Sequence, residues 1–177
     1  MVEVKWEPKE GKIYAILYKK MLEVFNVEDE KACSTAIFDV ISTSFDFIGT
    51  NQICVANEQG NFTILKNIQN DDSIQLNIIH TKFPRIRQIK TCFSQGNFNF
   101  LAAISTDCKL SIFSCDRLLA FSEDLEELKA DRVVKSKTRL TCLAINNLNE
   151  VKLGKREKSE PIDSETPLKK LKKWNFN

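Results

Sequence analysis

The chain has 177 residues, and its 26 Lys and Arg against 24 Asp and Glu give a formal net charge of +2 at pH 7. This length allows one ordinary domain with a sizeable hydrophobic core. No run of about 18 apolar residues is present, and the first residues lack the basic and then apolar pattern of a secretion signal. We therefore expect an intracellular protein that does not bind membranes, and the 12 Phe against 5 Gly favour a strand-rich fold.

Three times along the chain, three short apolar or alternating segments follow one another, separated by turn residues. They are residues 2–6, 12–18 and 22–27; residues 41–48, 52–56 and 62–66; and residues 86–93, 100–105 and 110–113. Alternation with period two is typical of strands, and the apolar run at 100–105 is typical of a strand buried on both faces. The third strands, aligned at Phe25, Leu65 and Phe113, are 40 and 48 residues apart, close to the roughly 40 to 45 residues of one β-propeller blade. The repeat predicts an all-β array of blades.

A further alternating segment follows each repeat and is expected to form the outer strand of its blade. These segments are residues 32–37, 74–79 and 132–135. The third lies in residues 122–135, where Ser122 is a candidate helix N-cap, so this stretch is either a short surface helix or a long insertion leading into the outer strand at 132–135.

The alternating residues 139–145 predict one more strand, with no segment after it to complete a blade. Residues 1–146 then supply about three blades and one orphan strand. A propeller closes a ring of about 4 to 8 blades. We therefore expect 1–146 to be the C-terminal portion of a longer propeller, with the remaining blades in a longer parent chain, and 147–177 to be a disordered basic tail.

His80 and Asp107 are expected to be structural residues. In WD40-type blades, a histidine before the first strand commonly bonds an aspartate in the turn between the second and third strands, and Asp107 lies 27 residues after His80. Such a bond would tie the loop to the turn. The alternative, a catalytic histidine, lacks a nucleophile or a paired carboxylate beside it, so we predict no enzyme activity and no catalytic residue.

The six cysteines, at positions 33, 54, 92, 108, 115 and 142, contain no Cys-x-x-Cys pair. Most lie inside apolar strands, where a free cysteine behaves as a small hydrophobic residue. We expect reduced, structural cysteines, no metal site and no cofactor.

Positive charge is concentrated in residues 151–177, which carry a net charge of +4 and leave −2 on the rest of the chain. Proline, serine and threonine interrupt this stretch, a composition typical of disorder. Its basic residues predict a nuclear-localisation signal or an RNA-contacting tail, and a merely solubilising tail is the third alternative. The residues concerned are Lys155, Arg156, Lys169, Lys170, Lys172 and Lys173.

Several segments resemble one known family. They are Val4-Lys5-Trp6-Glu7-Pro8, Leu22-Glu23-Val24-Phe25, Ala102-Ala103-Ile104-Ser105-Thr106-Asp107 with Leu110-Ser111-Ile112-Phe113, and Arg139-Leu140-Thr141-Cys142-Leu143 before a basic tail. In this order they resemble the C-terminal half of the PAK-interacting WD40 protein family, over about residues 2–146. A yeast relative of that family is a maintenance-of-killer factor needed for large ribosomal subunit assembly.

The resemblance implies a non-enzymatic scaffold of the nucleus and nucleolus, which acts in 60S ribosome biogenesis and rRNA processing. Its implied partners are pre-60S assembly factors, with rRNA contacted through the tail. The alternative it implies is negative regulation of PAK signalling by binding the regulatory region of a PAK kinase, and a generic propeller adaptor is a third possibility. The chain departs from the family pattern because no blade carries a Trp-Asp dipeptide and because Cys108 occupies the position where a turn glycine is usual.

Overall fold

The computed structural model describes residues 3–29, 31–69, 74–121 and 128–145. These belong to one compact unit, Met1–Asn147, and the predicted basic tail at 147–177, with its six named Lys and Arg residues, lies outside the described residues. Helix α1, six residues long, is too short to cross a bilayer, and no helix among the described ranges has the length and apolarity to do so.

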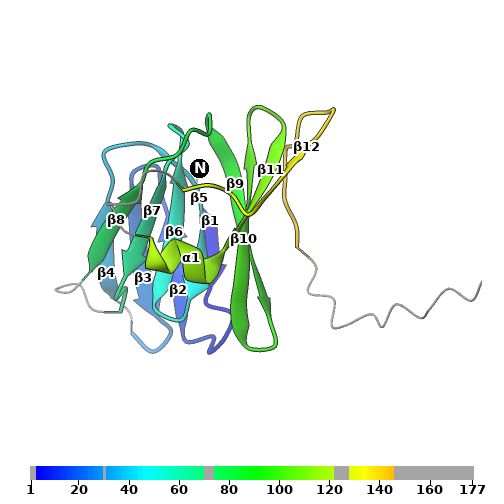
Figure 1. Cartoon of the computed structure of the whole chain (residues 1–177). Helices are drawn as coiled ribbons and strands as arrows, with labels where there is room; N and C mark the ends of the chain where they lie inside the picture. The colour runs from blue at the N-terminus through cyan, green and yellow to red at the C-terminus, as the bar shows by residue number, and fades with distance from the viewer. Residues whose placement is uncertain (1–2, 30, 70–73, 122–127, 146–177) are drawn as a thin grey trace, which may run out of the picture. The chain divides into compact units, whose positions relative to one another are not determined.

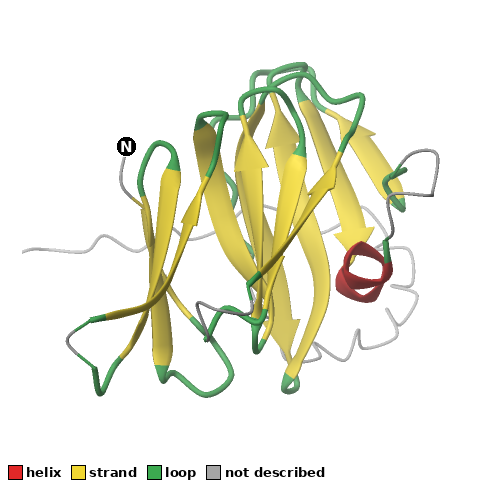
Figure 2. Ribbon diagram, turned by 90° about the vertical axis from the view of Figure 1, so that its left-hand side faces the viewer, coloured by secondary structure: helices red, strands yellow, loops and turns green. Residues whose placement is uncertain are grey.

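The described chain folds into three antiparallel sheets of four strands, each in sequence order (Figures 1 and 2). The first sheet contains β1 (Glu3–Trp6), β2 (Ile13–Leu17), β3 (Met21–Asn26) and β4 (Ala32–Ile37). The second contains β5 (Ser42–Gly49), β6 (Gln52–Asn57), β7 (Phe62–Lys66) and β8 (Gln75–Ile79). The third contains β9 (Ile86–Ser94), β10 (Asn97–Ser105), β11 (Lys109–Ser114) and β12 (Arg132–Lys135). The predicted all-β fold of about three blades, including each outer strand, is confirmed.

The second sheet is buried on both faces because its neighbours pack against it from either side. In β6, Ile53 and Val55 belong to the hydrophobic cluster shared with the first sheet, while Cys54 and Ala56 belong to the cluster shared with the third sheet and α1. Successive residues of a strand point to opposite faces, so this uninterrupted apolar run serves two interfaces at once. In β10 the residues from Leu101 to Ser105 are likewise all buried, as predicted.

Helix α1 (Cys115–Ala120) was not predicted from the sequence. It buries Cys115 and Leu118, and its start is held by Asp131, whose carboxylate accepts hydrogen bonds from the Ser114 amide and from Arg117, both at 2.6 Å. Six residues are too few for a helical period to be recognised. The helix depends instead on an acceptor that lies 17 residues away from Ser114. Of the alternative helix at 122–135, residues 122–127 lie outside the described residues, and residues 132–135 form the outer strand β12 instead.

The prediction of a strand at 139–145 is wrong, because these residues form no backbone ladder. The amide of Leu143 donates to the side-chain oxygen of Gln88 on β9 at 2.7 Å. A strand needs a partner backbone that offers its own N–H and C=O groups in register. Here the segment contacts the free edge of the third sheet through a side chain instead.

The inner strands β1 and β5 are joined by buried polar groups. The carboxylate of Glu3 accepts hydrogen bonds from the Ser44 hydroxyl at 3.3 Å and from the Phe45 amide at 3.1 Å. Lys5 lies 3.1 Å from Glu3 and donates to the Phe45 carbonyl across the same interface. These contacts set the position of β1 against β5 at the inner edge of both sheets.

Asp46 extends this connection to the third sheet. Its Oδ2 accepts a hydrogen bond from the Thr91 amide on β9 at 2.9 Å and lies 3.6 Å from the Lys5 ammonium and 3.5 Å from that of Lys90. Its Oδ1 accepts a hydrogen bond from the neighbouring Phe47 amide at 3.1 Å. We call the set Glu3, Lys5, Ser44, Asp46 and Lys90 the axial network. One carboxylate therefore contacts all three sheets.

The outward face of the first sheet carries a stacked aromatic row. Trp6 and Tyr14 have ring centroids 5.1 Å apart, and Tyr14 stacks on Phe25 at 5.0 Å. The three residues are neighbours across adjacent strands, since Trp6 pairs with Tyr14 and Tyr14 with Phe25. Trp6 is 56% exposed, so the row is an open apolar surface.

The axial network predicts that Asp46→Ala destabilises the chain strongly. The substitution removes one of the two carboxylates beside the partly buried Lys5, which keeps Glu3, and leaves the Thr91 amide without its acceptor. A buried donor left without its acceptor costs about 2 kcal/mol. Urea denaturation followed by circular dichroism measures the free energy of unfolding. Asp29→Ala, at an exposed turn, is the matched control and should change it by less than about 0.5 kcal/mol. Equal effects of the two substitutions would contradict a structural role for the network.

The buried thiols should be inert in the native chain. Burial raises the pKa of Cys115 to about 12 and the pKa of Cys54 well above its usual value, so both remain protonated and unreactive near pH 8.5. Cys142 is exposed. Iodoacetamide labelling read by mass spectrometry should modify Cys142 first, and Cys54 and Cys115 only after urea is added. Rapid native labelling of either buried thiol would contradict the packing described here.

Candidate binding groove between the first two sheets

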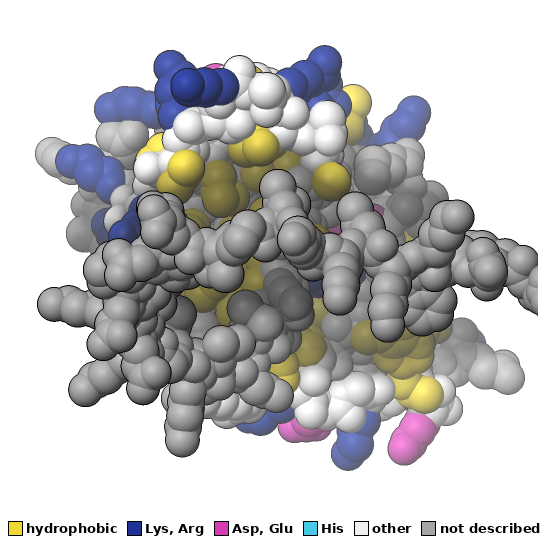
Figure 3. All heavy atoms as spheres, turned by 90° about the vertical axis from the view of Figure 1, so that its right-hand side faces the viewer, with side chains coloured by type: hydrophobic (Ala, Val, Ile, Leu, Met, Phe, Trp, Pro, Cys, Tyr) yellow, Lys and Arg dark blue, Asp and Glu magenta, His cyan; other side chains and the backbone are white. Residues whose placement is uncertain are grey.

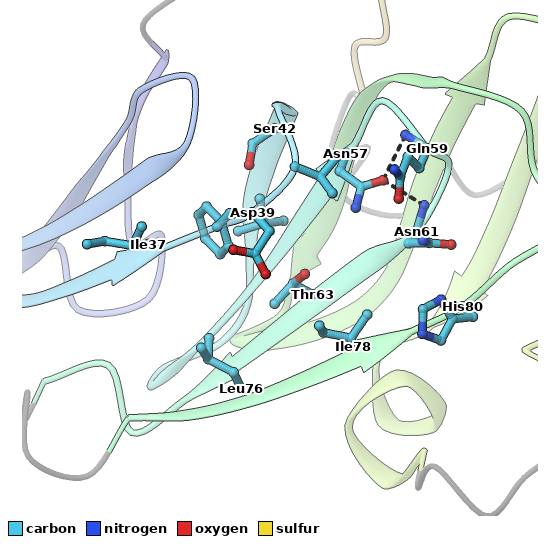
Figure 4. Close-up of a pocket in the computed structure, with 13 residues that line it drawn as sticks. Ile37, Asp39, Ser42, Asn57, Gln59, Asn61, Thr63, Leu76, Ile78 and His80 are labelled. Carbon is cyan, nitrogen blue, oxygen red and sulfur yellow. Dashed lines mark hydrogen bonds between the residues drawn. The ribbon is translucent and has the colours of Figure 1, made fainter.

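A groove of about 210 Å³ lies between the end of the first sheet and one face of the second (Figure 4). One wall is formed by Ile37, at the end of β4, and by the connection 38–42 that leads into β5. The other wall is formed by residues of β6, β7 and β8 and of the β6–β7 turn. The groove exists because two twisted sheets that pack at their inner edges diverge toward their outer edges.

One end of the groove is built around the β6–β7 turn. The Asn57 side-chain oxygen accepts hydrogen bonds from the amides of Gln59 and Asn61, both at 3.0 Å, which closes an Asx-type turn (Figure 4). The Asn61 side-chain oxygen in turn accepts from the Thr81 amide at 3.1 Å. Both asparagines keep their NH₂ groups as donors. This end of the groove is thus a polar surface held by hydrogen bonds.

The rim of the groove is apolar and exposed. Ile37 is 75% exposed, Leu76 51% and Ile78 48%, and the last two project from the same face of β8 because they are two residues apart. Asn77, between them, points the other way and donates to the Phe121 carbonyl at 2.9 Å. An apolar rim over amide groups suits an extended peptide, which offers apolar side chains and a hydrogen-bonding backbone.

His80 lies at the end of β8, where it lines the far end of the groove from Asp39 (Figure 4). The structure does not bring it to Asp107. The Asp107 carboxylate is instead bound by the Ser105 hydroxyl and by Lys109 at 2.5 Å. The expected hydrogen bond between His80 and Asp107 is therefore wrong.

The residue after His80 explains this outcome. The Thr81 hydroxyl donates to the Gly60 carbonyl at 2.6 Å, and its amide is bound by Asn61, so the start of the connection to β9 is held against the second sheet. His80 consequently belongs to the second sheet, whereas Asp107 belongs to the third. The alternating sequence of β8 predicted where the strand ends. It did not predict which sheet the following residues would contact.

Asp107 and Cys108 form the tight turn between β10 and β11. Burial by itself would raise the pKa of the Asp107 carboxyl, but hydrogen bonds from Lys109 and Ser105 outweigh it and hold the pKa below its usual value. Cys108 has φ +63°, in the left-handed region that favours glycine. The turn thus forms in the conformation expected for this position, although a cysteine occupies it.

Among the residues that the structure describes, no group of three His, Cys, Asp or Glu residues is placed to hold a metal ion. The sequence also failed to indicate the groove. Its rim residues are indistinguishable in the sequence from other alternating apolar residues of outer strands. The one available signal was the Asn57 to Asn61 turn, with two asparagines around a glycine.

The fold is similar to that of the β-propeller domain of Cps50 (Swd1) from Myceliophteria thermophila, with a TM-score of 0.62 at 12% sequence identity. The match covers 81% of this chain and 44% of that chain, so the chain spans less than half the length of that structure. At this identity the likeness shows the fold alone, which is a partial β-propeller.

No protein family and no curated protein matches the sequence. The resemblance to the PAK-interacting WD40 family therefore stays a prediction.

The β6–β7 turn predicts that alanine substitution destabilises the chain more at Gly60 than at Gly96, although both glycines have a positive φ. Gly60 has φ +87° and Gly96 has φ +77°. A Cβ at Gly60 would lie 2.6 Å from the Pro84 carbonyl oxygen and still closer to that of Phe83, whereas a Cβ at Gly96 would meet nothing within 4 Å. Gly96→Ala should cost about 1 kcal/mol for its φ alone, and Gly60→Ala about 2 kcal/mol more, because backbone must move. Urea denaturation of both variants tests this, and equal costs would contradict the close approach at Gly60.

Proposed function

We propose that the chain is a non-enzymatic protein-interaction scaffold whose groove between the first two sheets binds an extended segment of a partner protein. The observation that carries the proposal is the exposed apolar rim of Ile37, Leu76 and Ile78 above the hydrogen-bonded turn. A rigid array of sheets holds such a surface at little entropic cost on binding.

Within that role, we propose that the protein acts in large ribosomal subunit assembly in the nucleolus. Support comes from the resemblance of the segments described above, above all residues 139–143, to the PAK-interacting WD40 family. The basic clusters around Lys155 and Lys169 support it further, since they fit a nuclear address and can neutralise RNA phosphates. Pre-60S assembly factors are then the partners of the groove.

We also propose that the aromatic row of Trp6, Tyr14 and Phe25 packs against a further blade of a longer propeller. Support comes from the position of the row on an outward sheet face, because in a closed propeller the faces of neighbouring blades bury apolar surface against each other. In the longer chain, with Trp6 kept as the single tryptophan, its fluorescence should shift to shorter wavelength relative to the Trp174→Phe variant of this chain. An unchanged emission maximum would contradict the packing.

The groove predicts that Leu76→Lys with Ile78→Lys abolishes partner binding without unfolding the chain. The substitutions place two charges on the rim, where an apolar partner would have to desolvate them, and we expect at least tenfold weaker recovery of partners. Affinity purification of the tagged chain from cells at moderate salt, with mass spectrometry and probing for precursor rRNA, measures this.

Val133→Lys with Val134→Lys is the matched control, because both valines lie on the outer strand β12 and are 51% and 50% exposed. Recovery of pre-60S factors with precursor rRNA, lost in the groove variant and kept in the control, is the expected result. A PAK kinase recovered without ribosomal precursors would replace ribosome assembly by kinase regulation as the function. Partners recovered equally by both variants would show that the groove is not the binding surface.

A further inference from the structure

A second, strongly basic pocket of about 490 Å³ lies where the three sheets meet. It is formed by the β2–β3 turn, the start of β5, the start of β9, the β10–β11 turn and the segment after β12. Four of its lining residues are cationic and come from these separate parts of the chain. They are Lys19, Arg85, Arg87 and Arg139, and the hydroxyls of Thr106 and Thr141 lie among them.

The positive charge of this pocket is not neutralised by the described part of the chain. No acidic residue lines it, and none of its four cationic side chains makes an ion pair or a side-chain hydrogen bond with another described residue. The nearest turn carboxylate in sequence, Asp107, is already bound to Lys109. Lys and Arg side chains also gather along the upper edge of the face shown in Figure 3.

Arg87 adds a separate observation. Its Nε is buried and has no hydrogen-bond partner among the described residues. A buried donor without an acceptor costs free energy, so such groups are normally satisfied by protein, water or a ligand. An anion in the pocket would supply that acceptor.

Backbone hydrogen bonds hold the walls of the pocket in place. The Lys19 carbonyl accepts from the Ser42 amide at 2.8 Å, which joins the first sheet to the second. The Arg85 carbonyl accepts from the Thr106 amide at 3.0 Å, which joins the start of β9 to the β10–β11 turn. The cations are therefore presented by a preformed frame, which reduces the entropic cost of binding.

The kind of anion follows from the shape and chemistry of the pocket. Guanidinium groups and hydroxyls suit the three oxygens of a phosphate monoester, and the volume lies in the range of pockets that hold a small ligand group. Single-stranded nucleic acids need a basic track with aromatic rings for stacking, and no aromatic side chain lines this pocket.

We propose that this pocket binds a phosphorylated serine or threonine of a partner protein. The pocket adjoins the groove between the first two sheets, since Ser42 lines both, but none of its four cations lines the groove. The proposal therefore stands whether or not that groove binds a partner. Arg87 and Arg139 contact the phosphate, Lys19 and Arg85 add to the local positive potential, and the threonine hydroxyls complete the set of donors. Binding of such a partner depends on a kinase, which makes the interaction switchable.

The test is fluorescence anisotropy of the full 177-residue chain with labelled peptide pools that carry a central phosphoserine or phosphothreonine between degenerate flanks. The unphosphorylated pools and a single-stranded RNA oligonucleotide are the comparison probes, and inorganic phosphate is the competitor. The phosphorylated pools should bind at least tenfold more tightly than the unphosphorylated ones, and phosphate should displace them.

Arg87→Gln with Arg139→Gln should weaken this binding at least tenfold, since charge-assisted hydrogen bonds are lost. Arg139→Gln alone, at an exposed residue outside any sheet, should weaken it severalfold and covers the case in which the double variant fails to fold. Arg132→Gln, an exposed arginine on β12, is the matched control and should leave binding within twofold.

A variant of the tail, Lys169→Gln with Lys170→Gln, distinguishes peptide binding by the pocket from peptide binding by the basic tail. Binding that is lost in the tail variant and kept in the pocket variants overturns the proposal. Equal binding of phosphorylated and unphosphorylated pools, or absence of binding by the unaltered chain, also overturns it. RNA binding that is lost in the pocket variants while phosphopeptide binding is kept would assign the pocket to nucleic acid instead.

Discussion

Asp46 is the residue on which the arrangement of the three sheets depends. It sits on the innermost strand of the middle sheet and contacts a lysine and an amide that come from the sheets on either side. Apolar packing alone is non-directional, so two sheets can slide against each other at little cost in buried area. A buried carboxylate with specific donors permits only one register, because any displacement leaves charges unpaired. The axial network therefore sets how the sheets meet, and the two hydrophobic clusters supply the bulk of the stabilisation.

Both candidate binding surfaces follow from that arrangement. Sheets that converge on one axis must diverge toward their outer strands, which opens the groove beside β8. The ends of the inner strands must also come together, which gathers loops from five separate parts of the chain around one pocket. The groove offers apolar surface and amides, whereas the pocket offers positive charge, so the two surfaces suit different features of a partner. A scaffold that recognises one extended segment and one modified side chain gains both affinity and control.

Polar side chains in this chain serve two distinct purposes. Those of the axial network and of the β6–β7 turn are satisfied within the protein, where they set geometry. The four cations of the basic pocket lack side-chain partners among the described residues, and Arg87 is the clearest case because its Nε is also buried. Three other buried side-chain atoms, Asn77 Oδ1, Thr91 Oγ1 and Ser111 Oγ, also lack a partner among the described residues, but they are uncharged. Four cations gathered around one pocket have instead the pattern expected of a binding site rather than of a structural network.

The sequence by itself determined the strands and the order in which they form sheets, because alternation with period two and turn residues act locally. Twelve strands lie where the pattern predicted them, and even Cys108 adopts the positive φ that its place in the turn requires. The short helix α1 was not predicted, and the strand predicted at 139–145 does not form, since the first depends on the distant Asp131 and the second on the partner backbone available to it. Only the tertiary structure decided that His80 stays with the second sheet, that Asp46 joins three sheets, and that four cations meet in one pocket. Each of these results depends on residues that are brought together from positions about 20 to 120 apart in the chain, and no local pattern encodes such distances.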